Sequence, residues 1–258
     1  MTKIKVLYED SDILAIDKPS GISVHGDGKT KEKTVTDWIL KNYPEMKNIG
    51  EPIADIPRPG IVHRLDRNTS GVLLLAKNQK THQFLKRQFQ NRTIKKTYLA
   101  IVEGWMKEDK GVINKPIGRS PSDFRRWLAG RGARGVLREA VTEYKVLKRF
   151  EAKTRSPYEG LAFVKRRQGL RKTDNQEGRF TILEIQPKTG RTHQIRVHMK
   201  FLNHPIVGDS LYNPTGAIPE GITRMALHAH FIEFKNLKGK TIKIESPAPL
   251  EFRKMIKS

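Results

Sequence analysis

Residues 61–77 decide how the chain folds, and they are Ile61-Val62-His63-Arg64-Leu65-Asp66-Arg67-Asn68-Thr69-Ser70-Gly71-Val72-Leu73-Leu74-Leu75-Ala76-Lys77. Val72 to Ala76 is apolar without alternation, which is typical of a short, fully buried strand, and a Thr-Ser-Gly turn signal precedes it. A polar turn anchored by such a strand can hold one side chain rigidly at a cleft, and Asp66 is the acidic residue of this turn. The alternative is structural, with Asp66 closing an Asx turn toward Asn68 and Thr69.

The composition favours a nucleic-acid partner. The 258 residues include 50 Lys and Arg against 27 Asp and Glu, a net charge of +23. The positive residues recur along the whole chain, whereas membrane-surface proteins concentrate them in a tail or an amphipathic helix. Cysteine is absent from the sequence, which excludes disulfides and thiolate metal sites. No apolar run approaches the ~20 residues of a membrane span, and the first residues lack signal-peptide character. We therefore expect a cytoplasmic protein without membrane contact.

Hydrophobic periodicity predicts an α+β chain. A helix is expected over 34–43, capped by Thr34 or Thr36, and an amphipathic helix over 81–90. Strands are expected at 5–8, 13–16, 93–102, 141–147, 180–185, 225–234 and 241–244, with a loop over 44–60 and a C-terminal helix over 250–256. In the strand over 93–102, Tyr98 shares one side with Ala100 and Val102, as any strand aromatic could.

Two segments concentrate basic residues. Residues 115–138 are predicted to be a loop in which arginines alternate with Phe124 and Trp127, and this combination suits phosphate binding and base stacking. The alternative is a solvated loop with two hydrophobic anchors. Residues 151–179 are predicted to be an inserted hairpin or a partly disordered arm. The candidate RNA contacts in these segments are Arg125, Arg126, Trp127, Arg131, Lys165, Arg166 and Arg167.

A second informative stretch is Thr189-Gly190-Arg191-Thr192-His193-Gln194-Ile195-Arg196-Val197-His198. Ile195, Met199 and Leu202 have helical spacing, which predicts a helix capped near Thr192, with Arg196 one position from the buried face. His193 and His198 are five positions apart and cannot share one helical face, so we expect hydrogen-bonding histidines and no metal site.

Together these segments resemble the RluA family of RNA pseudouridine synthases. The resemblance rests on His63-Arg64-Leu65-Asp66 with Thr69-Ser70-Gly71, and on the stretch around Arg196. It also rests on Lys18-Pro19-Ser20-Gly21, Lys96-Thr97-Tyr98-Leu99-Ala100, His204-Pro205-Ile206-Val207-Gly208-Asp209 and Leu227-His228-Ala229. These motifs cover most of the chain in a characteristic order.

The resemblance implies one catalytic domain over 1–258, an α+β fold with a large, bent, mainly antiparallel mixed sheet and flanking helices and loops. We expect no N-terminal accessory RNA-binding module, because the chain begins within a few residues of its first predicted strand. Substrate selection would then fall to the basic segments 119–138 and 151–179. The implied partner is ribosomal or transfer RNA, with no DNA partner, no cofactor and no metal, and we expect a monomer.

The resemblance also implies the catalytic groups, Asp66, Tyr98 and Arg196. Burial alone raises a carboxyl pKa above its reference of ~3.9, so an ionised Asp66 needs a buried cation, which maps to Arg196. Asp66 would either attack the sugar or initiate glycal formation, and both roles stay open. Tyr98 would stack on the uracil or accept a proton from its ring. A cleft is expected where the turn at Asp66 meets the helix of Arg196.

Other motif positions are candidates for substrate binding. The target nucleotide should flip out of paired RNA, and Arg64 would fill the gap that it leaves, since a guanidinium can both stack on bases and bind phosphate. The alternative for Arg64 is a structural ion pair. Ile195 would pack the pocket. The remaining candidates for substrate binding are His63, Arg191, His193 and Gln194.

Two other functions compete with this one. A non-catalytic RNA-binding or ribosome-assembly factor could keep the fold, and a charge of +23 would suffice for it. Retention of Asp66, Tyr98 and Arg196 together argues against such a factor, because phosphate binding requires neither a buried Asp nor its partner. A hydrolytic nuclease is a distant third, since His63, His193 and His198 lack paired carboxylates.

Overall fold

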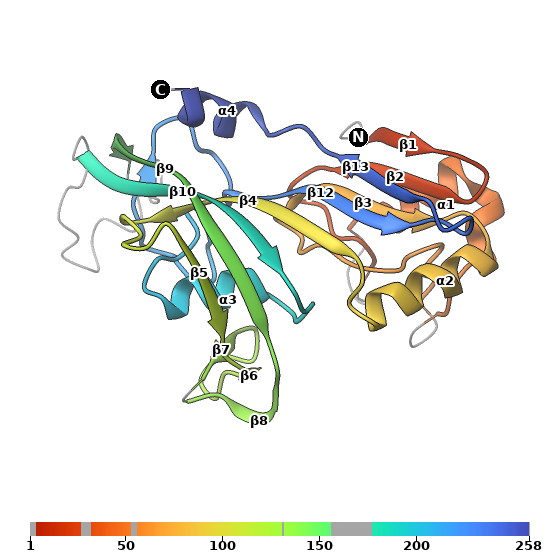
Figure 1. The fold of residues 1–258 in the computed structure, drawn as a ribbon, viewed down its shortest axis with the longest axis horizontal. Helices are drawn as coiled ribbons and strands as arrows, with labels where there is room; N and C mark the ends of the chain where they lie inside the picture. The colour runs from red at the N-terminus through yellow and green to blue at the C-terminus, as the bar shows by residue number, and fades with distance from the viewer. Residues whose placement is uncertain (1–3, 27–31, 53–55, 131, 156–176, 258) are drawn as a thin grey trace. The chain divides into compact units, whose positions relative to one another are not determined.

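The computed structural model describes residues 4–26, 32–52, 56–130, 132–155 and 177–257 (Figure 1). The chain divides into two compact units. The first consists of Met1–Thr97 with His228–Ala248, and the second of Tyr98–Leu227 with Pro249–Ser258. The single catalytic domain expected from the sequence stays a prediction.

The first unit is built on a mixed sheet. The hairpin of β1 (Lys5–Glu9) and β2 (Ile13–Lys18) is antiparallel, and β2 continues antiparallel into β3 (Ser70–Ala76). The start of β3 pairs in parallel with β12 (Leu227–Lys235), and β12 pairs antiparallel with β13 (Thr241–Glu245). All seven residues of β3 are buried, which confirms the predicted core strand.

Gly71 allows β3 and β12 to approach closely at the end of the turn that carries Asp66. Its φ is 114°, in the region that favours glycine, and a Cβ at this position would overlap the Ala229 carbonyl of β12. A larger residue would therefore separate the two strands directly after the turn that carries Asp66.

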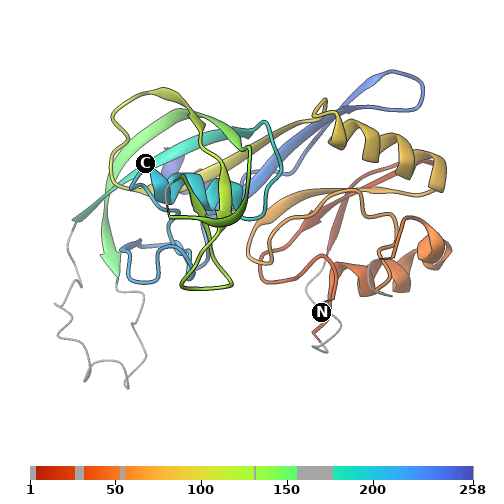
Figure 2. The same cartoon turned by 90° about the horizontal axis from the view of Figure 1, so that it is seen from below.

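Two helices and one 3-10 helix complete the first unit. Helix α1 (Val35–Asn42) begins at the predicted cap, because Thr34 and Asp37 form a reciprocal capping box. The 3-10 helix η1 (Pro44–Asn48) lies in the segment predicted to be a loop. Helix α2 (Gln79–Gln90) begins two residues before the prediction, since the Asn78 side chain accepts the Thr81 N–H. It packs against β3 (Figures 1 and 2).

The long strands of the second unit pair antiparallel with one another. Strand β10 (Glu177–Pro187) lies between β4 (Lys95–Glu103) and β9 (Val141–Arg155), while β5 (Lys110–Asn114) and β11 (Ile218–Pro219) pair with the two ends of β9. Strands β9 and β10 are longer than predicted. Their register shifts between Ile182 and Leu183, opposite Leu147, which is where the predicted strand ended. Both ends of the predicted arm at 151–179 are therefore strand, while 156–176 lie outside the described residues.

The prediction of a loop over 115–138 was wrong. This segment forms a three-stranded antiparallel sheet of β6 (Ile117–Arg119), β7 (Trp127–Ala129) and β8 (Arg134–Arg138). We call it the basic sheet. Its Ile117 and Ala129 pack with Val197 and Tyr212 in a small hydrophobic cluster, which anchors strands that are too short and too polar to be recognised locally.

Helix α3 (Gln194–Phe201) packs Ile195 and Met199 against the face of β4 that carries Ala100, Val102 and Tyr98. The helix begins next to Thr192, where the cap was predicted, but Thr192 itself is not the capping residue. The N-cap is His193, in a left-handed conformation with φ of 55° and without a side-chain cap bond. Helix α4 (Leu250–Lys257) closes this unit, with Phe252 buried. In the part of the chain that is described, no helix has the length and apolarity to cross a membrane.

Candidate active site

Asp66 lies where the sequence predicts it, in a turn that leads directly into β3. The Thr69 N–H donates to the Asp66 carbonyl at 3.1 Å, which closes the turn through the main chain. Leu65 and Thr69 are buried and Asp66 is half-buried. The carboxyl group therefore sits on a turn fixed at both ends by buried residues.

The side chain of Lys18, at the end of β2, holds this turn through a hydrogen bond to its main chain. Lys18 is fully buried, and its Nζ donates to the carbonyls of Pro19 at 2.9 Å, Ile22 at 2.8 Å and Arg67 at 3.0 Å. The Ser20 hydroxyl also donates to the Asn68 carbonyl at 2.7 Å. An ammonium group has three donors, and these three carbonyls match them. Lys18 thus ties the Lys-Pro-Ser-Gly bend to the residues that follow Asp66, a role that sequence reasoning missed.

His63 fixes the other side of the turn. Its Nε2 accepts the Leu74 N–H at 2.9 Å, so the ring carries its proton on Nδ1, and the ring stacks on Phe89 with centroids 4.8 Å apart. Burial, together with a smaller effect of the charge of Lys96, lowers the pKa of His63 to about 3. His63 is therefore a neutral anchor between the turn of Asp66 and β3, and its contact with substrate stays a prediction.

This anchor predicts an acid-sensitive contribution to stability. Because the pKa of His63 is about 3 in the folded protein and ~6.5 when unfolded, the unfolded chain binds more protons between these values, and stability falls as pH falls through that window. At pH 5 the loss is about 2 kcal/mol relative to pH 7.5. His63→Gln keeps an acceptor for the Leu74 N–H and does not titrate. Urea unfolding at both pH values should show a loss about 2 kcal/mol smaller in the variant. Equal losses would contradict the assignment.

Ser70 and His228 join β3 to β12 beside the same turn. Both are buried, and the Ser70 hydroxyl lies 2.9 Å from His228 Nδ1. His228 Nε2 lies 3.2 Å from the Ser246 carbonyl, which accepts only, so Nε2 carries the proton and Nδ1 accepts from Ser70. This bond holds the short parallel pairing of the two strands in register.

Arg196 is buried and held by Asp209. Its Nε and Nη2 donate to the two carboxylate oxygens of Asp209 at 2.7 Å and 2.8 Å. Asp209 also accepts the N–H groups of Leu211 at 3.0 Å and Tyr212 at 3.1 Å. Such a bidentate pair fixes both the plane and the direction of the guanidinium. Sequence reasoning missed Asp209 as a partner, because it lies 13 positions from Arg196 in an irregular segment.

Tyr212 connects this pair to the basic sheet. Its hydroxyl accepts the Trp127 N–H at 3.0 Å and lies 3.0 Å from His193 Nδ1. The Arg196 guanidinium lies 5.0 Å from the Tyr212 ring centroid. Tyr212 was not among the predicted site residues, and nothing in its local sequence marks it.

The other residues of the late motif hold this region together. Gln194 is buried; its amide donates to the Val141 carbonyl and the Thr142 hydroxyl, and its oxygen accepts from Thr189 and Arg191. Arg191 Nε donates to the Glu139 carbonyl at 2.9 Å. His193 and His198 are hydrogen-bonded, as predicted. Ile195 is buried beside the half-buried Tyr98. Substrate binding by Arg191, His193, Gln194 and Ile195 stays a prediction.

Asp66 belongs to the first unit, while Arg196 and Tyr98 belong to the second, which begins at Tyr98. The pairing of Asp66 with Arg196 and the expected cleft stay predictions. Each charged group is held within its own unit. Lys18 and His63 hold the turn of Asp66, and Asp209 and Tyr212 contact the Arg196 guanidinium.

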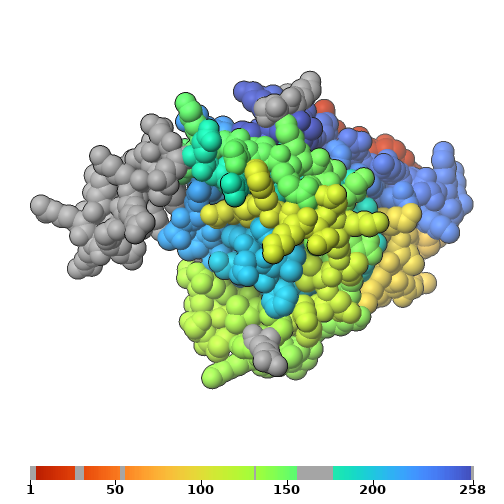
Figure 3. All heavy atoms as spheres, turned by 60° about the vertical axis from the view of Figure 1, so that its left-hand side comes forward, coloured from red at the N-terminus to blue at the C-terminus, as the bar shows by residue number. Residues whose placement is uncertain are grey.

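The basic sheet carries exposed cationic and aromatic groups. The Arg119 guanidinium lies 4.4 Å from the Trp127 ring centroid, and its Nη1 donates to the carbonyl of the exposed Phe124. Arg125 forms a bidentate pair with Asp123, and Arg126 lies 3.4 Å from the same carboxylate. Figure 3 shows the yellow-green atoms of this segment on the visible face. Arg131 and Lys165 to Arg167 lie outside the described residues.

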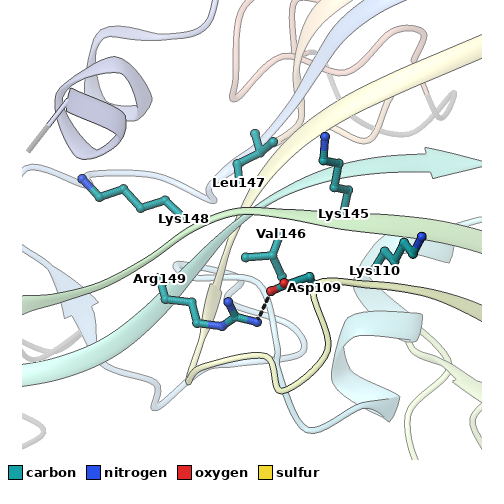
Figure 4. A pocket seen from close by; sticks show the side chains of 7 residues that line it. All are labelled: Asp109, Lys110, Lys145, Val146, Leu147, Lys148 and Arg149. Atoms are coloured by element: carbon teal, nitrogen blue, oxygen red, sulfur yellow. Dashed lines mark ion pairs between the residues drawn. The ribbon is translucent and has the colours of Figure 1, made fainter.

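One groove lies at the edge of β9 where β5 begins. It has a volume of about 440 Å³ and is lined by Asp109, Lys110 and 145–149. Figure 4 shows Lys145 and Leu147 on one side of the strand and Val146 and Arg149 on the other, with Arg149 paired to Asp109 at 2.7 Å. None of the predicted site residues lines this groove, so it contributes nothing to the site of Asp66 or Arg196.

Comparison with known proteins gives a consistent result. The sequence matches the RNA pseudouridylate synthase family over residues 12–201. It is 34% identical over 254 residues to an uncharacterized RNA pseudouridine synthase of Synechocystis, covering 98% of this chain and 68% of that protein. It is 35% identical over 258 residues to ribosomal large subunit pseudouridine synthase D of Vibrio cholerae, covering 95% and 68%.

The fold agrees with a solved structure. Human RNA pseudouridylate synthase domain containing 4 superposes with a TM-score of 0.65 and 25% identity, covering 96% of this chain and 90% of that one. The α+β pseudouridine synthase fold predicted from the sequence is thereby confirmed.

Proposed function

The chain belongs to the RNA pseudouridylate synthase family and is an RNA pseudouridine synthase, and from that premise we propose that it modifies ribosomal RNA with Asp66 as its catalytic carboxylate. The ribosomal substrate is supported by relatives such as that of Vibrio cholerae, whose name specifies the large ribosomal subunit. The observation that carries the assignment of Asp66 is its turn, which Lys18 and His63 hold from two sides.

The reaction needs a charged carboxylate and no co-reactant. The bond between the anomeric carbon and N1 of uracil breaks, and a bond from that carbon to C5 forms. The proton on C5 leaves and N1 gains one, so the product is an isomer of the substrate. In the proposed mechanism Asp66 either attacks the anomeric carbon or initiates glycal formation, and both routes begin with the ionised form.

Arg196 is proposed to keep Asp66 charged. A carboxylate in a dry pocket is disfavoured unless a cation opposes the loss of hydration. Asp209 supports this role because it aligns the Arg196 guanidinium through two hydrogen bonds. Arg196 would then be a positioning residue that acts through Asp66.

Base recognition is assigned to Tyr98, Ile195 and Arg64. We propose that Tyr98 stacks on the flipped uracil, which needs no change in its ionisation, and that Ile195 packs beside it. Arg64 is exposed, and its Nη1 lies 3.2 Å from His25 Nε2. An exposed guanidinium can move into a base stack, which supports its proposed role in filling the gap left by the target nucleotide.

The basic sheet is the proposed RNA-docking surface. Replacing Arg125, Arg126 and Arg131 with Ala should lower the slope of log affinity against log salt by about one unit for each phosphate that the protein no longer neutralises. The control replaces three exposed lysines on other surfaces, Lys107, Lys238 and Lys240, with Ala. Filter binding across a salt series measures both slopes. If the slope fell equally in both variants, the basic sheet would not be a specific part of the RNA interface.

The substrate proposal is tested with purified protein on unmodified RNAs. Large-subunit ribosomal RNA, as transcript and in precursor particles, is incubated beside transfer RNA transcripts, and pseudouridines are mapped by chemical sequencing. We expect new pseudouridines in ribosomal RNA alone. Modification of transfer RNA alone would overturn the substrate, while binding without any modification would favour an assembly factor. We also propose that the protein is a cytoplasmic monomer, which this experiment does not test.

A further inference from the structure

Three basic side chains gather beside the catalytic turn, and we call them the His25 cluster: His25, Arg58 and Arg64. Arg64 lies two positions before Asp66, and its Nη1 is 3.2 Å from His25 Nε2. His25 Nδ1 lies 2.8 Å from the Gly26 carbonyl. That carbonyl accepts only, so Nδ1 carries the proton and Nε2 accepts from Arg64. A neutral His25 therefore orients the Arg64 guanidinium.

Arg58 contributes a donor without a hydrogen-bond partner. Its Nε is buried and makes no hydrogen bond to any residue that the structure describes. An unsatisfied buried N–H is rare in proteins because it loses its hydration without compensation. Burial lowers the pKa of Arg58, and the charge of Arg64 lowers it further, so the two guanidinium groups are close enough to repel one another. Both charges also lower the pKa of His25, after the larger effect of its own burial.

Within the described ranges neither Arg58 nor Arg64 has an ion pair with a carboxylate, whereas the nearby Arg67 is 3.0 Å from Glu32. Two guanidinium groups lie close together here, and one of them has an unsatisfied N–H. A bound anion would stabilise this arrangement. A guanidinium matches the oxygens of a phosphate with its planar set of donors. Every uridine within an RNA chain has a phosphate on each side, within reach of groups beside its sugar.

We propose that the His25 cluster binds a backbone phosphate of the RNA next to the target uridine, with Arg58 as its central donor. This inference rests on the proposed function, since it places the phosphate beside Asp66. Arg58 was not among the residues predicted from the sequence. It lies in a Pro-Arg-Pro-Gly segment without a strand or helix pattern, and it is recognised only through its unsatisfied nitrogen.

The test is phosphate-ethylation interference on a large-subunit ribosomal RNA transcript. Ethylation removes the charge of one phosphate per molecule, and the phosphates that the protein needs are depleted from the bound fraction. Wild type, Arg58→Gln and the control Arg87→Gln, which replaces an exposed arginine of α2, are compared. Arg58→Gln should bind about 10-fold more weakly, as expected when one charge-assisted hydrogen bond is removed, and should no longer depend on one phosphate. The control should match wild type in both respects.

A stability measurement separates this role from a structural one. If Arg58 serves the ligand, Arg58→Gln removes a repulsive charge and a buried unsatisfied donor, so its Tm should equal or exceed that of wild type. A lower Tm together with an unchanged interference pattern would mean that Arg58 is structural, and the inference would be wrong. The same transcripts report pseudouridine formation by wild type. If wild type is active and Arg58→Gln needs the same phosphates as wild type, this inference is overturned and the proposed function stays intact.

Discussion

Asp66→Asn should abolish pseudouridine formation, with a rate reduced by at least ~10³-fold, while RNA affinity stays within a few-fold of wild type. Asn has nearly the same shape as Asp but carries no charge, and it can neither attack a sugar carbon nor accept its proton. The main chain of the turn is held by Lys18 and His63, so the substitution should leave the fold unchanged.

Single-turnover rates and dissociation constants for one RNA measure this directly. Asp109→Asn is the matched control, because it removes a highly exposed carboxylate that pairs with Arg149 at the surface. It should keep the wild-type rate. If Asp66→Asn reduced affinity as strongly as it reduced activity, Asp66 would be a structural residue of the turn, as in the Asx alternative.

Asp209→Ala should lower the free energy of unfolding by about 3–5 kcal/mol. The substitution leaves the buried Arg196 without the carboxylate that accepts two of its hydrogen bonds. The N–H groups of Leu211 and Tyr212 are also left without this acceptor. Asp209→Asn keeps an acceptor for those N–H groups and should be milder. Turnover should fall in both variants, because Arg196 is no longer aligned.

Urea unfolding and Tm of Asp209→Ala test this pair against an exposed one. Glu51 pairs with Lys86 at 2.7 Å, but both side chains are more than a third exposed. Exposed ion pairs contribute roughly 0–1 kcal/mol, so Glu51→Ala should have little effect. Equal effects of the two alanine substitutions would mean that the Arg196–Asp209 pair does not organise this region.

The parts of the fold that depend on local patterns could be predicted from the sequence. The continuous apolar run indicated the buried strand β3, and Thr34 marked the start of α1 because its partner Asp37 lies within the same turn. Alternation placed Tyr98, Ala100 and Val102 on one face of β4. In each case the residues that determine the structure lie within a few positions of one another.

The parts that depend on tertiary contacts could not be predicted in this way. The basic sheet has strands of three to five residues, and its arginine-rich sequence shows no strand alternation. Lysine is normally exposed, and Lys18 is buried where the nearby carbonyls of Pro19 and Ile22 and the distant carbonyl of Arg67 converge on its ammonium group. The N-cap of α3 is His193, in a left-handed conformation and without a side-chain cap bond, so no local capping pattern marks the start of this helix.

In the proposed function, Asp66 catalyses uridine isomerisation at specific sites in ribosomal RNA. The decisive experiment is pseudouridine-specific sequencing of total RNA from cells without this gene, rescued by wild type or by Asp66→Ala. We expect one or a few ribosomal pseudouridines to disappear and to return only with wild type. Return of those sites with Asp66→Ala would contradict the role of Asp66, and an unchanged set of ribosomal pseudouridines would contradict the substrate.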